Sequence, residues 1–341
     1  MDLDLTDREN VSKKIEIGKE IIYLTREECM NLGISVDDII DFTKEALLAH
    51  GRKEYEMPAK IGIHPLEEAF FHAMPAYVPS KNAAGIKWVE CFPKNHERFN
   101  LPQTSGLMIL NDEYSGWPLA IMDAVWITAM RTPAVTSIAA KTLHPDAETF
   151  GMFGCGVQGM GHVEFITHTL KNLKKIYVHD VRKEAMDNLI ATVQPKIDVE
   201  IVKAKDPEEL VKSCEAVSSA TVILKTPLKV VKKEWVSKGQ TILPCDLNTF
   251  WDPEIPKMAD KYIVDSIDEH ELFDSMGYFP DGLPEIYCET GEVIAGLKKG
   301  RESKDQLIVN SNIGIAVADV VMAREIFNRA LDKGVGTKLP L

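Results

Sequence analysis

A glycine-rich turn between a predicted strand and a predicted helix is the feature that most constrains how this chain can fold. Residues 149–153 form a short apolar run, and Gly154, Gly156 and Gly159 follow it with the spacing GxGxxG. In such a loop the first glycine permits a tight turn, the second lets the backbone approach a pyrophosphate, and the third allows close helix–strand packing. The helix that begins here also offers N–H groups and a partial positive charge to phosphates. We therefore predict a dinucleotide-binding loop.

An acidic residue follows this loop at the spacing that a dinucleotide site requires. A second apolar run, at residues 175–179, ends directly before Asp180. A carboxylate about 20 residues beyond the loop accepts hydrogen bonds from the ribose hydroxyls and repels a 2′-phosphate. We expect NAD rather than NADP, although Arg182 could partner a 2′-phosphate.

From residue 148 onward, short apolar runs alternate with stretches of helical periodicity, such as residues 157–173 and 207–213. The predicted strands are 149–153, 175–179, 199–202, 216–223, 240–245, 262–264 and 306–309. Alternating βα units build a parallel sheet with right-handed crossovers. We predict an α/β protein with a Rossmann-type doubly wound parallel sheet.

The N-terminal part has a different pattern. Between residues 60 and 123, short apolar runs are separated by Gly, Pro and Asn, which is typical of a mostly antiparallel sheet. The first twenty residues or so are expected to be a polar extension. A long apolar helix at 313–331 must pack against other elements, and we assign it to the N-terminal domain. The expected organisation is a split, sheet-rich α+β substrate and dimerisation domain (1–125 with 313–341) and an NAD-binding Rossmann domain (126–312).

Composition limits the classes to which the protein can belong. Its 341 residues are enough for two domains, and a net charge of −13 argues against nucleic acid, which needs clustered Lys and Arg. No apolar run approaches the roughly 18 residues of a membrane span, and the acidic N-terminus is not a secretory signal. None of the six cysteines lies in a CxxC pair or near a His at metal spacing. We expect a cytoplasmic protein with reduced thiols, no metal and no membrane contact.

Further segments carry a resemblance to a known family. They are residues 85–89 (GIKWV), 92–95 (FPKN), 106–112 (GLMILND), 116–120 (GWPLA), 127–136 (ITAMRTPAVT), 244–246 (PCD) and 311–316 (SNIGIA). Together with the GxGxQ form of the loop, they resemble the ornithine cyclodeaminase/μ-crystallin family over nearly the whole chain after about residue 20.

The resemblance implies a Rossmann domain, a sheet-rich substrate domain and homodimers in which the small domains join. Members include ornithine cyclodeaminases, one class of alanine dehydrogenases, ketimine and pyrroline-carboxylate reductases, and a vertebrate lens protein that binds a dinucleotide. The implied substrate is therefore a small α-amino acid or a cyclic imine, and the implied reaction is hydride transfer at Cα with NAD.

The carboxylate of such a substrate needs cationic, preferably forked, donors. The resemblance assigns this role to Lys60, Lys87 and Arg131, and it gives Lys87 a catalytic role as well. Arg131 lies in an otherwise apolar helical stretch, which favours function over a surface position. Lys87 follows an apolar strand, and strand alternation could instead point it to solvent.

A candidate proton carrier, Asp246, follows the apolar run that ends at Leu243. The carboxyl ends of strands in a doubly wound sheet line the ligand crevice, and the catalytic acid of the family maps to this position. A carboxylate there can take and return protons as an amine becomes an imine, although Asp246 could also be a helix N-cap. Besides the three glycines and Asp180, the expected cofactor contacts are Val157, Gln158, Thr132, Thr136, Ala220 and Thr221.

One position departs from the cyclodeaminase pattern. Cyclodeaminases have a carboxylate two residues before the position of Met74, where it helps to recognise the substrate amine, and this chain has His72 there. Glu67, Glu68 or Asp246 could compensate. His72 is either a substrate-binding residue or an ordinary strand histidine.

Three functions remain open on the sequence. The first is ornithine cyclodeaminase, which converts L-ornithine to L-proline and ammonia with recycled NAD, and residues 86–89 and 92–95 favour it. The second is an NAD-dependent amino acid dehydrogenase or cyclic imine reductase, with a net change in NADH. The third is a non-catalytic dinucleotide-binding protein, against which the acid at Asp246 argues.

Overall fold

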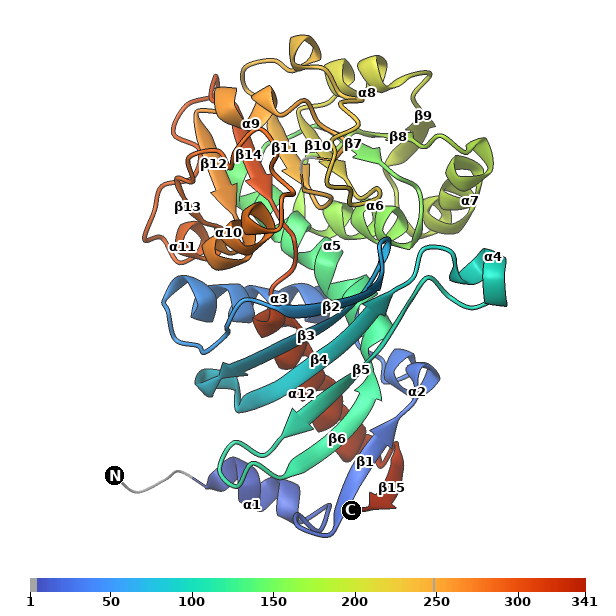
Figure 1. The fold of residues 1–341 in the computed structure, drawn as a ribbon, viewed down its shortest axis with the longest axis vertical. Helices are drawn as coiled ribbons and strands as arrows, with labels where there is room; N and C mark the ends of the chain where they lie inside the picture. Colours follow the sequence, from blue (N-terminus) through green and yellow to red (C-terminus); the bar gives the residue numbers. More distant parts are fainter. Residues whose placement is uncertain (1–4, 248) are drawn as a thin grey trace. The chain divides into compact units, whose positions relative to one another are not determined.

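The computed structural model describes residues 5–247 and 249–341, which form two compact units. Unit 1 consists of the chain up to Arg131 together with Ile315–Leu341, and unit 2 is Thr132–Gly314. The first boundary falls inside helix α5 (Ala124–Leu143), and the second lies just before helix α12 (Ala316–Lys333). Figure 1 shows the elements of each unit.

Unit 1 is built on a mixed seven-stranded sheet with the order β15-β1-β6-β5-β4-β3-β2. Strands β2 to β6 pair antiparallel in sequence order, as predicted, whereas β1 joins β6 in parallel and pairs antiparallel with β15. The C-terminal strand was not predicted, because all four of its residues are exposed and show no alternation. The strands are β1 (Glu20–Leu24), β2 (Ile61–Leu66), β3 (Ala69–Val78), β4 (Ala83–Cys91), β5 (Thr104–Asn111), β6 (Pro118–Asp123) and β15 (Thr337–Pro340).

Helix α12 packs against α3 and against strands β3, β4 and β5, so that it covers one face of this sheet (Figure 1). It ends at Gly334, whose φ of +64° suits a residue without a side chain. The predicted polar extension is wrong, because α1 begins at Thr6 and the side chains of Val11 and Ile15 are buried. The other helices of unit 1 are α1 (Thr6–Ser12), α2 (Arg26–Met30), α3 (Val36–Gly51), the 3₁₀ turn η1 (Pro79–Lys81) and α4 (Asn95–Phe99).

Unit 2 contains an eight-stranded sheet in which every pair of neighbouring strands is parallel. Its order is β13-β12-β14-β11-β10-β7-β8-β9, so the chain runs outward from β7 and then returns to the other side at β10. The reversal point of such a sheet is where ligands bind. The strands are β7 (Thr149–Phe153), β8 (Lys175–His179), β9 (Glu200–Lys203), β10 (Ala216–Ser219), β11 (Thr241–Pro244), β12 (Lys261–Val264), β13 (Cys288–Glu289) and β14 (Ile308–Ser311).

Helices cover both faces of this parallel sheet. One core cluster joins Phe150 of β7 to Val163 and Leu189, and a second joins Ile242 of β11 to Leu210. Strands buried on both faces read as continuous apolar runs, which is why they were found from sequence. The helices are α6 (Val157–Thr169), α7 (Lys183–Val193), η2 (Gln194–Lys196), α8 (Pro207–Ser213), η3 (Lys233–Trp235), α9 (Glu254–Met258), α10 (Ile267–Ser275) and α11 (Thr290–Ile294). The predicted fold class, a doubly wound parallel sheet plus a sheet-rich unit, is confirmed.

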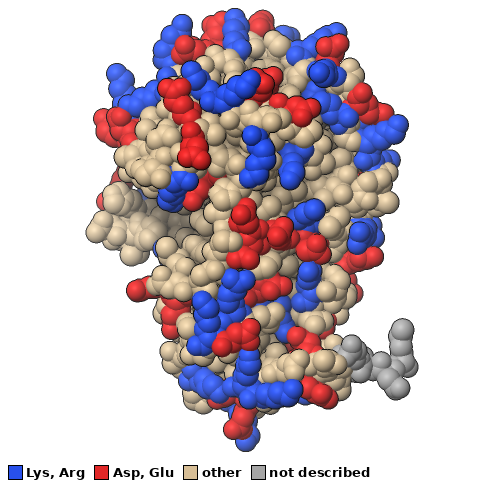
Figure 2. Space-filling model, turned by 180° about the vertical axis from the view of Figure 1, so that it is seen from behind, with Lys and Arg blue, Asp and Glu red and all other residues tan. Residues whose placement is uncertain are grey.

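The charged side chains of both signs are interspersed on the face shown in Figure 2. Exposed charged side chains also pair locally, as Lys212 does with Glu208 one helical turn earlier at 2.5 Å. Within the described part of the chain, no helix combines the length and hydropathy needed to cross a bilayer.

Candidate active site

Two glycines of the loop in unit 2 are required by the fold itself. Gly154 has a φ of +87°, and a Cβ on it would lie 2.6 Å from the carbonyl oxygen of Ala220. A Cβ on Gly159 would lie 1.9 Å from the carbonyl oxygen of Gly154. Both positions therefore exclude side chains because the turn from β7 into α6 is tight and the helix packs closely against it.

Gly156 is different, because none of the described residues around it requires it to be glycine. It is the N-cap of α6 with φ −78° and ψ −163°, a conformation open to any residue. A Cβ on it would meet no atom within 4 Å. The bare backbone keeps the helix N-terminus open to a group from outside, and a pyrophosphate fits this position because a helix N-terminus binds anions.

Asp180 lies at the end of β8, where it contacts the same loop. Its Oδ2 accepts a hydrogen bond from the backbone N–H of Cys155 at 2.8 Å, and its Oδ1 accepts one from the N–H of Arg182 at 2.9 Å. Each oxygen keeps a lone pair for a further donor, as ribose hydroxyls would supply. The Arg182 side chain is 71% exposed, with its Nε 3.7 Å from Oδ1. Exposed apolar side chains flank the loop at Val157 and Val181.

Asp246 follows β11 and is completely buried. Its Oδ1 accepts from the Ser219 hydroxyl at 2.6 Å, and its Oδ2 accepts from the Thr221 hydroxyl at 2.6 Å and the Thr221 N–H at 3.0 Å. Burial raises the pKa of this carboxyl, although these hydrogen bonds oppose the shift. Trp251 donates from Nε1 to the Ser219 hydroxyl at 2.7 Å. Sequence reasoning missed Ser219 and Trp251, because neither carries a motif.

The other predicted cofactor contacts of unit 2 differ in accessibility. Ala220 and Thr221 are partly exposed just past the end of β10. Thr136 is 1% exposed, and its hydroxyl lies 3.0 Å from His162 Nε2 and 3.2 Å from the Cys245 sulfur. The Thr132 carbonyl lies 3.5 Å from the same hydroxyl, and the Gln158 carbonyl lies 2.7 Å from His162 Nδ1. Thr136 is therefore held inside the unit by protein groups.

In unit 1, the carboxylate of Asp319 joins two of the predicted cations. Lys87 Nζ donates to Oδ2 at 2.6 Å, and Arg131 Nε donates to Oδ1 at 3.0 Å. The side chains of Lys87, Arg131 and Asp319 are 1%, 7% and 0% exposed. Lys87 comes from β4, Arg131 from α5 and Asp319 from α12, so three elements far apart in sequence meet here. The predicted alternative of a solvent-exposed Lys87 is wrong.

The ionisation of this cluster follows from its burial. Burial lowers the pKa of Lys87 to about 7, helped by the charges of Arg131 and Lys60 and opposed by Asp319. Burial alone would raise the pKa of Asp319, but the charges of Arg131 and Lys87 outweigh it and hold that pKa below its ordinary value. Lys87 can therefore exchange a proton near neutral pH while Asp319 stays ionised.

Lys60 and His72 are also buried, at 7% and 8% exposure. Burial, together with the smaller effects of the charges of Lys60, His64 and Lys87, lowers the pKa of His72 to about 3. Its ring stacks on Phe70, with centroids 3.9 Å apart and planes 16° apart. His72 is therefore a neutral imidazole at pH 7 and lacks the negative charge of a carboxylate.

Asp319 is the residue of unit 1 that sequence reasoning missed. It is an acidic residue in the otherwise apolar run of residues 315–323 (IAVADVVMA), which is a signal that could have found it. Asp is rarely fully buried unless it is paired. The pattern therefore indicated a buried partner, although not which one.

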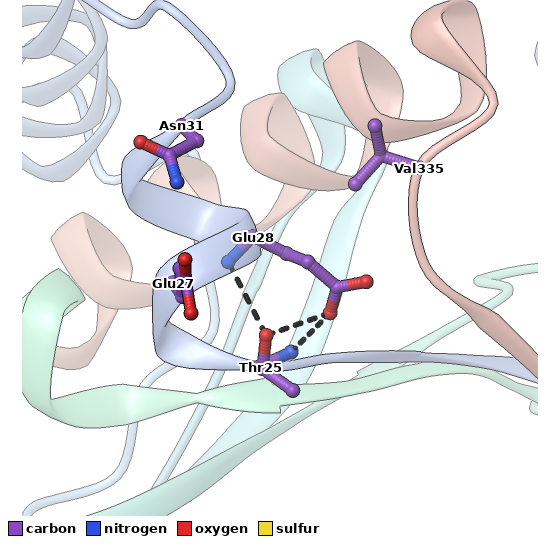
Figure 3. Close-up of a pocket in the computed structure, with 5 residues that line it drawn as sticks. All are labelled: Thr25, Glu27, Glu28, Asn31 and Val335. Carbon is purple, nitrogen blue, oxygen red and sulfur yellow. Dashed lines mark hydrogen bonds between the residues drawn. The ribbon is translucent and has the colours of Figure 1, made fainter.

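A surface hollow of about 340 Å³ lies elsewhere in unit 1 and contains none of the predicted site residues. Figure 3 shows its lining by Thr25, Glu27, Glu28, Asn31 and Val335. The Glu28 carboxylate there accepts hydrogen bonds from the backbone N–H and the hydroxyl of Thr25, both at 2.8 Å. The carboxylate thus serves the N-terminal cap of α2, and the hollow offers no buried charge to a ligand.

Unit 2 has a parallel sheet with a glycine-rich loop and the acidic Asp180, and unit 1 has a mixed sheet with a buried cation cluster. These features define a class of two-unit α/β proteins with a Rossmann-type dinucleotide domain. The chain belongs to the ornithine cyclodeaminase/mu-crystallin family, whose model matches residues 20–334. The resemblance stated from the sequence is thereby confirmed.

Relatives and solved structures agree with this assignment. The chain is 33% identical over 329 residues to an alanine dehydrogenase of Archaeoglobus fulgidus, covering 94% of this chain and 98% of the relative. It superposes with a TM-score of 0.83 on the Δ1-pyrroline-2-carboxylate reductase of Thermococcus litoralis in complex with NADH and L-proline, at 27% identity and coverage of 93% and 99%. An archaeal alanine dehydrogenase dimer with bound NAD gives a TM-score of 0.82, 32% identity and coverage of 94% and 99%.

Proposed function

We propose that this protein is an NAD-dependent oxidoreductase that interconverts a small α-amino acid and the corresponding imino acid. The observation that carries the proposal is the buried pair Lys87 and Arg131, held by Asp319 in a chain whose other unit has the dinucleotide loop. The solved relatives with NAD, or with NADH and L-proline, support it.

The residues of unit 2 fit an NAD molecule. The N-terminus of α6, left bare at Gly156, would hold the pyrophosphate, and Asp180 would accept from the adenosine ribose hydroxyls. When bound, the nicotinamide supplies the hydride chemistry. The acidic Asp180 disfavours a 2′-phosphate, which supports NAD over NADP.

The residues of unit 1 would bind the substrate carboxylate. Lys87, Lys60 and Arg131 are three buried cations, and Asp319 is the acid that pairs with two of them. Such a positive, water-poor site stabilises an anion strongly because few solvent dipoles screen it. The forked guanidinium of Arg131 matches the geometry of a carboxylate.

Oxidation of the amino acid removes a hydride from Cα and a proton from the amine, and reduction of the imino acid returns both. Lys87, with a pKa of about 7, can hold or release that proton at neutral pH. Asp246 is a second carrier, because burial raises its pKa. Since Asp246 is completely buried, we assign its route outward to the hydroxyl of Thr221, a partly exposed residue, 2.6 Å from Oδ2.

The charge of the site favours an uncharged substrate side chain. The distal ammonium of ornithine would add a cation to a cluster that already holds three, and the neutral His72 offers it no countercharge. We therefore rank an amino acid dehydrogenase or cyclic imine reductase above ornithine cyclodeaminase, the function that the sequence favoured. The similarity to an alanine dehydrogenase supports the same ranking.

A substrate panel tests the proposal. The purified protein would be given NAD⁺ with L-alanine, L-proline or L-ornithine, and NADH with pyruvate plus ammonium or with Δ1-pyrroline-2-carboxylate. We expect a stoichiometric change in NADH absorbance with at least one alanine- or proline-type substrate. Proline and ammonia formed from ornithine without net NADH would support the cyclodeaminase instead. No turnover, together with no NADH binding, would exclude both enzymes.

We also propose a homodimer formed through the open face and edge of the sheet in unit 1. Large apolar side chains are exposed on neighbouring strands there: Ile61, Ile63 and Leu66 on β2, Trp88 on β4 and Leu107 on β5. Exposed apolar patches and unpaired edge strands are typical of interfaces, and an archaeal relative is described as a dimer. Light scattering should give twice the monomer mass, and Ile63→Lys with Leu107→Lys should reduce it to the monomer. Met258→Lys, an equally exposed apolar position of unit 2, is the control.

A further inference from the structure

We propose that Asp319 is a positioning residue, which holds Arg131 by Nε and Lys87 by Nζ so that the guanidinium fork stays available for the substrate carboxylate. This inference rests on the proposed function, because it assigns the residue that shapes the carboxylate site. Asp319 acts through Arg131 and Lys87 and needs no contact with the substrate.

The proposal is based on which N–H groups of the Arg131 guanidinium are hydrogen-bonded within the protein. A guanidinium has five N–H donors, and Asp319 accepts a hydrogen bond from the one at Nε of Arg131, at 3.0 Å. Within the described part of the chain, no residue accepts a hydrogen bond from its two Nη groups. Because the Nη pair forms parallel hydrogen bonds to a carboxylate, an acceptor at Nε orients the plane without occupying the fork.

The same carboxylate controls the charge of Lys87. The ionisable groups around this lysine come from four elements: Asp319 on α12, Arg131 on α5, Lys60 just before β2 and His72 on β3. Asp319 is the acid among them, and its charge helps Lys87 keep a proton that burial would otherwise remove. Without Asp319, the lysine would be neutral over more of the pH range and would bind an anion less well.

Stability alone does not explain an acid at this place. Desolvating a carboxylate and two cations costs as much as their attraction returns, so apolar groups of similar size are often as stable. Helix α12 is otherwise apolar around Asp319, from Ala316 to Ala323. The ion cluster is therefore better explained by what it does for a ligand than by the packing of the helix.

Asp319→Asn tests the inference, since it keeps the shape and removes the charge. The probe is pyrrole-2-carboxylate, a planar carboxylate that cannot be reduced, titrated in the presence of NADH. We expect its Kd to rise at least tenfold and the pH midpoint of its binding to fall by about one unit or more, while the Kd for NADH changes less than twofold.

The control is Asp7→Asn on helix α1, whose carboxylate pairs with an arginine of α12. Asp7 pairs through both carboxylate oxygens with the buried Arg324 of α12, so this variant removes the same charge from another ion pair of unit 1. The Asp7 side chain is 32% exposed, so this pair is less buried than that of Asp319. It should leave the carboxylate Kd and its pH midpoint unchanged. Equal effects in the two variants, or an unchanged Kd in Asp319→Asn, would overturn the positioning role.

A second variant keeps the test decisive if Asp319→Asn does not fold. Asp319→Glu retains the charge but moves it by one methylene, so the pH midpoint should stay near that of the wild type while the carboxylate Kd rises. A wild-type Kd from this variant would overturn the inference. If the wild-type protein binds NADH but no carboxylate, the proposed function itself fails, which is a different result.

Discussion

Replacing Gly156 by alanine separates what the loop does for the fold from what it does for a ligand. The added Cβ would meet no protein atom within 4 Å, and the backbone at φ −78° is open to alanine. At Gly159 the same change would put the Cβ 1.9 Å from the carbonyl oxygen of Gly154. Two glycines three residues apart are thus expected to respond oppositely.

The magnitudes follow from these geometries. At Gly156, alanine is a poorer N-cap by up to about 1 kcal/mol, while the loss of unfolded-state freedom returns about 0.4–1 kcal/mol, so folding stability should change by less than about 1 kcal/mol. A methyl group between α6 and a pyrophosphate would cost at least one charge-assisted hydrogen bond, about 1.5–3 kcal/mol. That free energy corresponds to an NADH Kd about 10- to 150-fold higher. Gly159→Ala should instead destabilise the fold by about 1–3 kcal/mol or more.

The assay combines thermal unfolding without cofactor and NADH titration by fluorescence. Gly156→Ala should melt like the wild type and bind NADH weakly, whereas Gly159→Ala should melt earlier. If Gly156→Ala binds NADH with the wild-type Kd, no pyrophosphate lies against this helix, and the explanation given for the bare N-terminus is refuted.

Three further predictions follow from the same residues. Asp180→Asn should raise the NADH Kd at least tenfold and bring the NADPH Kd closer to it, because the repulsion of a 2′-phosphate is lost. An unchanged ratio of the two Kd values, measured by titration, would contradict the role assigned to Asp180. Pyrrole-2-carboxylate should bind more weakly as the pH rises through about 7, because Lys87 is protonated below its pKa and neutral above it. Calorimetry of Lys87→Met should show weaker binding at every pH and no change in affinity around pH 7. Thr221→Val should lower kcat about 100-fold or more, because it removes the hydroxyl that donates to Asp246. Thr221→Ser keeps this hydroxyl and should retain most of the wild-type kcat. Equal kcat values for the two variants in steady-state assays would contradict the proposed proton route.

The ranking of substrates is where the fold and the relatives altered the expectation from the sequence. Sequence similarity in residues 86–89 and 92–95 favoured ornithine cyclodeaminase, but short similar segments reflect common ancestry more than the charge of a site. The cation cluster and the neutral His72 depend on burial, which no segment of the sequence displays. The net charge around a substrate can be assessed only when the tertiary structure shows which side chains surround it.

Local patterns determined the unit that binds the dinucleotide. The strand before Gly154, the spacing of the glycines and the position of Asp180 all lie within about thirty residues, so sequence order already specifies their geometry. Buried parallel strands are visible as apolar runs, and the class of fold followed from their alternation with helices. The N-terminal helix α1 was missed because only Val11 within it is buried, which gives no periodicity to detect.

Only the tertiary structure brings together the buried ion cluster of Lys87, Arg131 and Asp319. Lys87 and Asp319 are 232 residues apart in the chain, and Arg131 and Asp319 are 188 apart. The sequence named the two cations through resemblance and left their acid unrecognised, because an ion pair between distant elements has no spacing rule. Packing of α12 against β4 removes water from these groups, and that desolvation sets the charge of Lys87 and so the chemistry that unit 1 can perform.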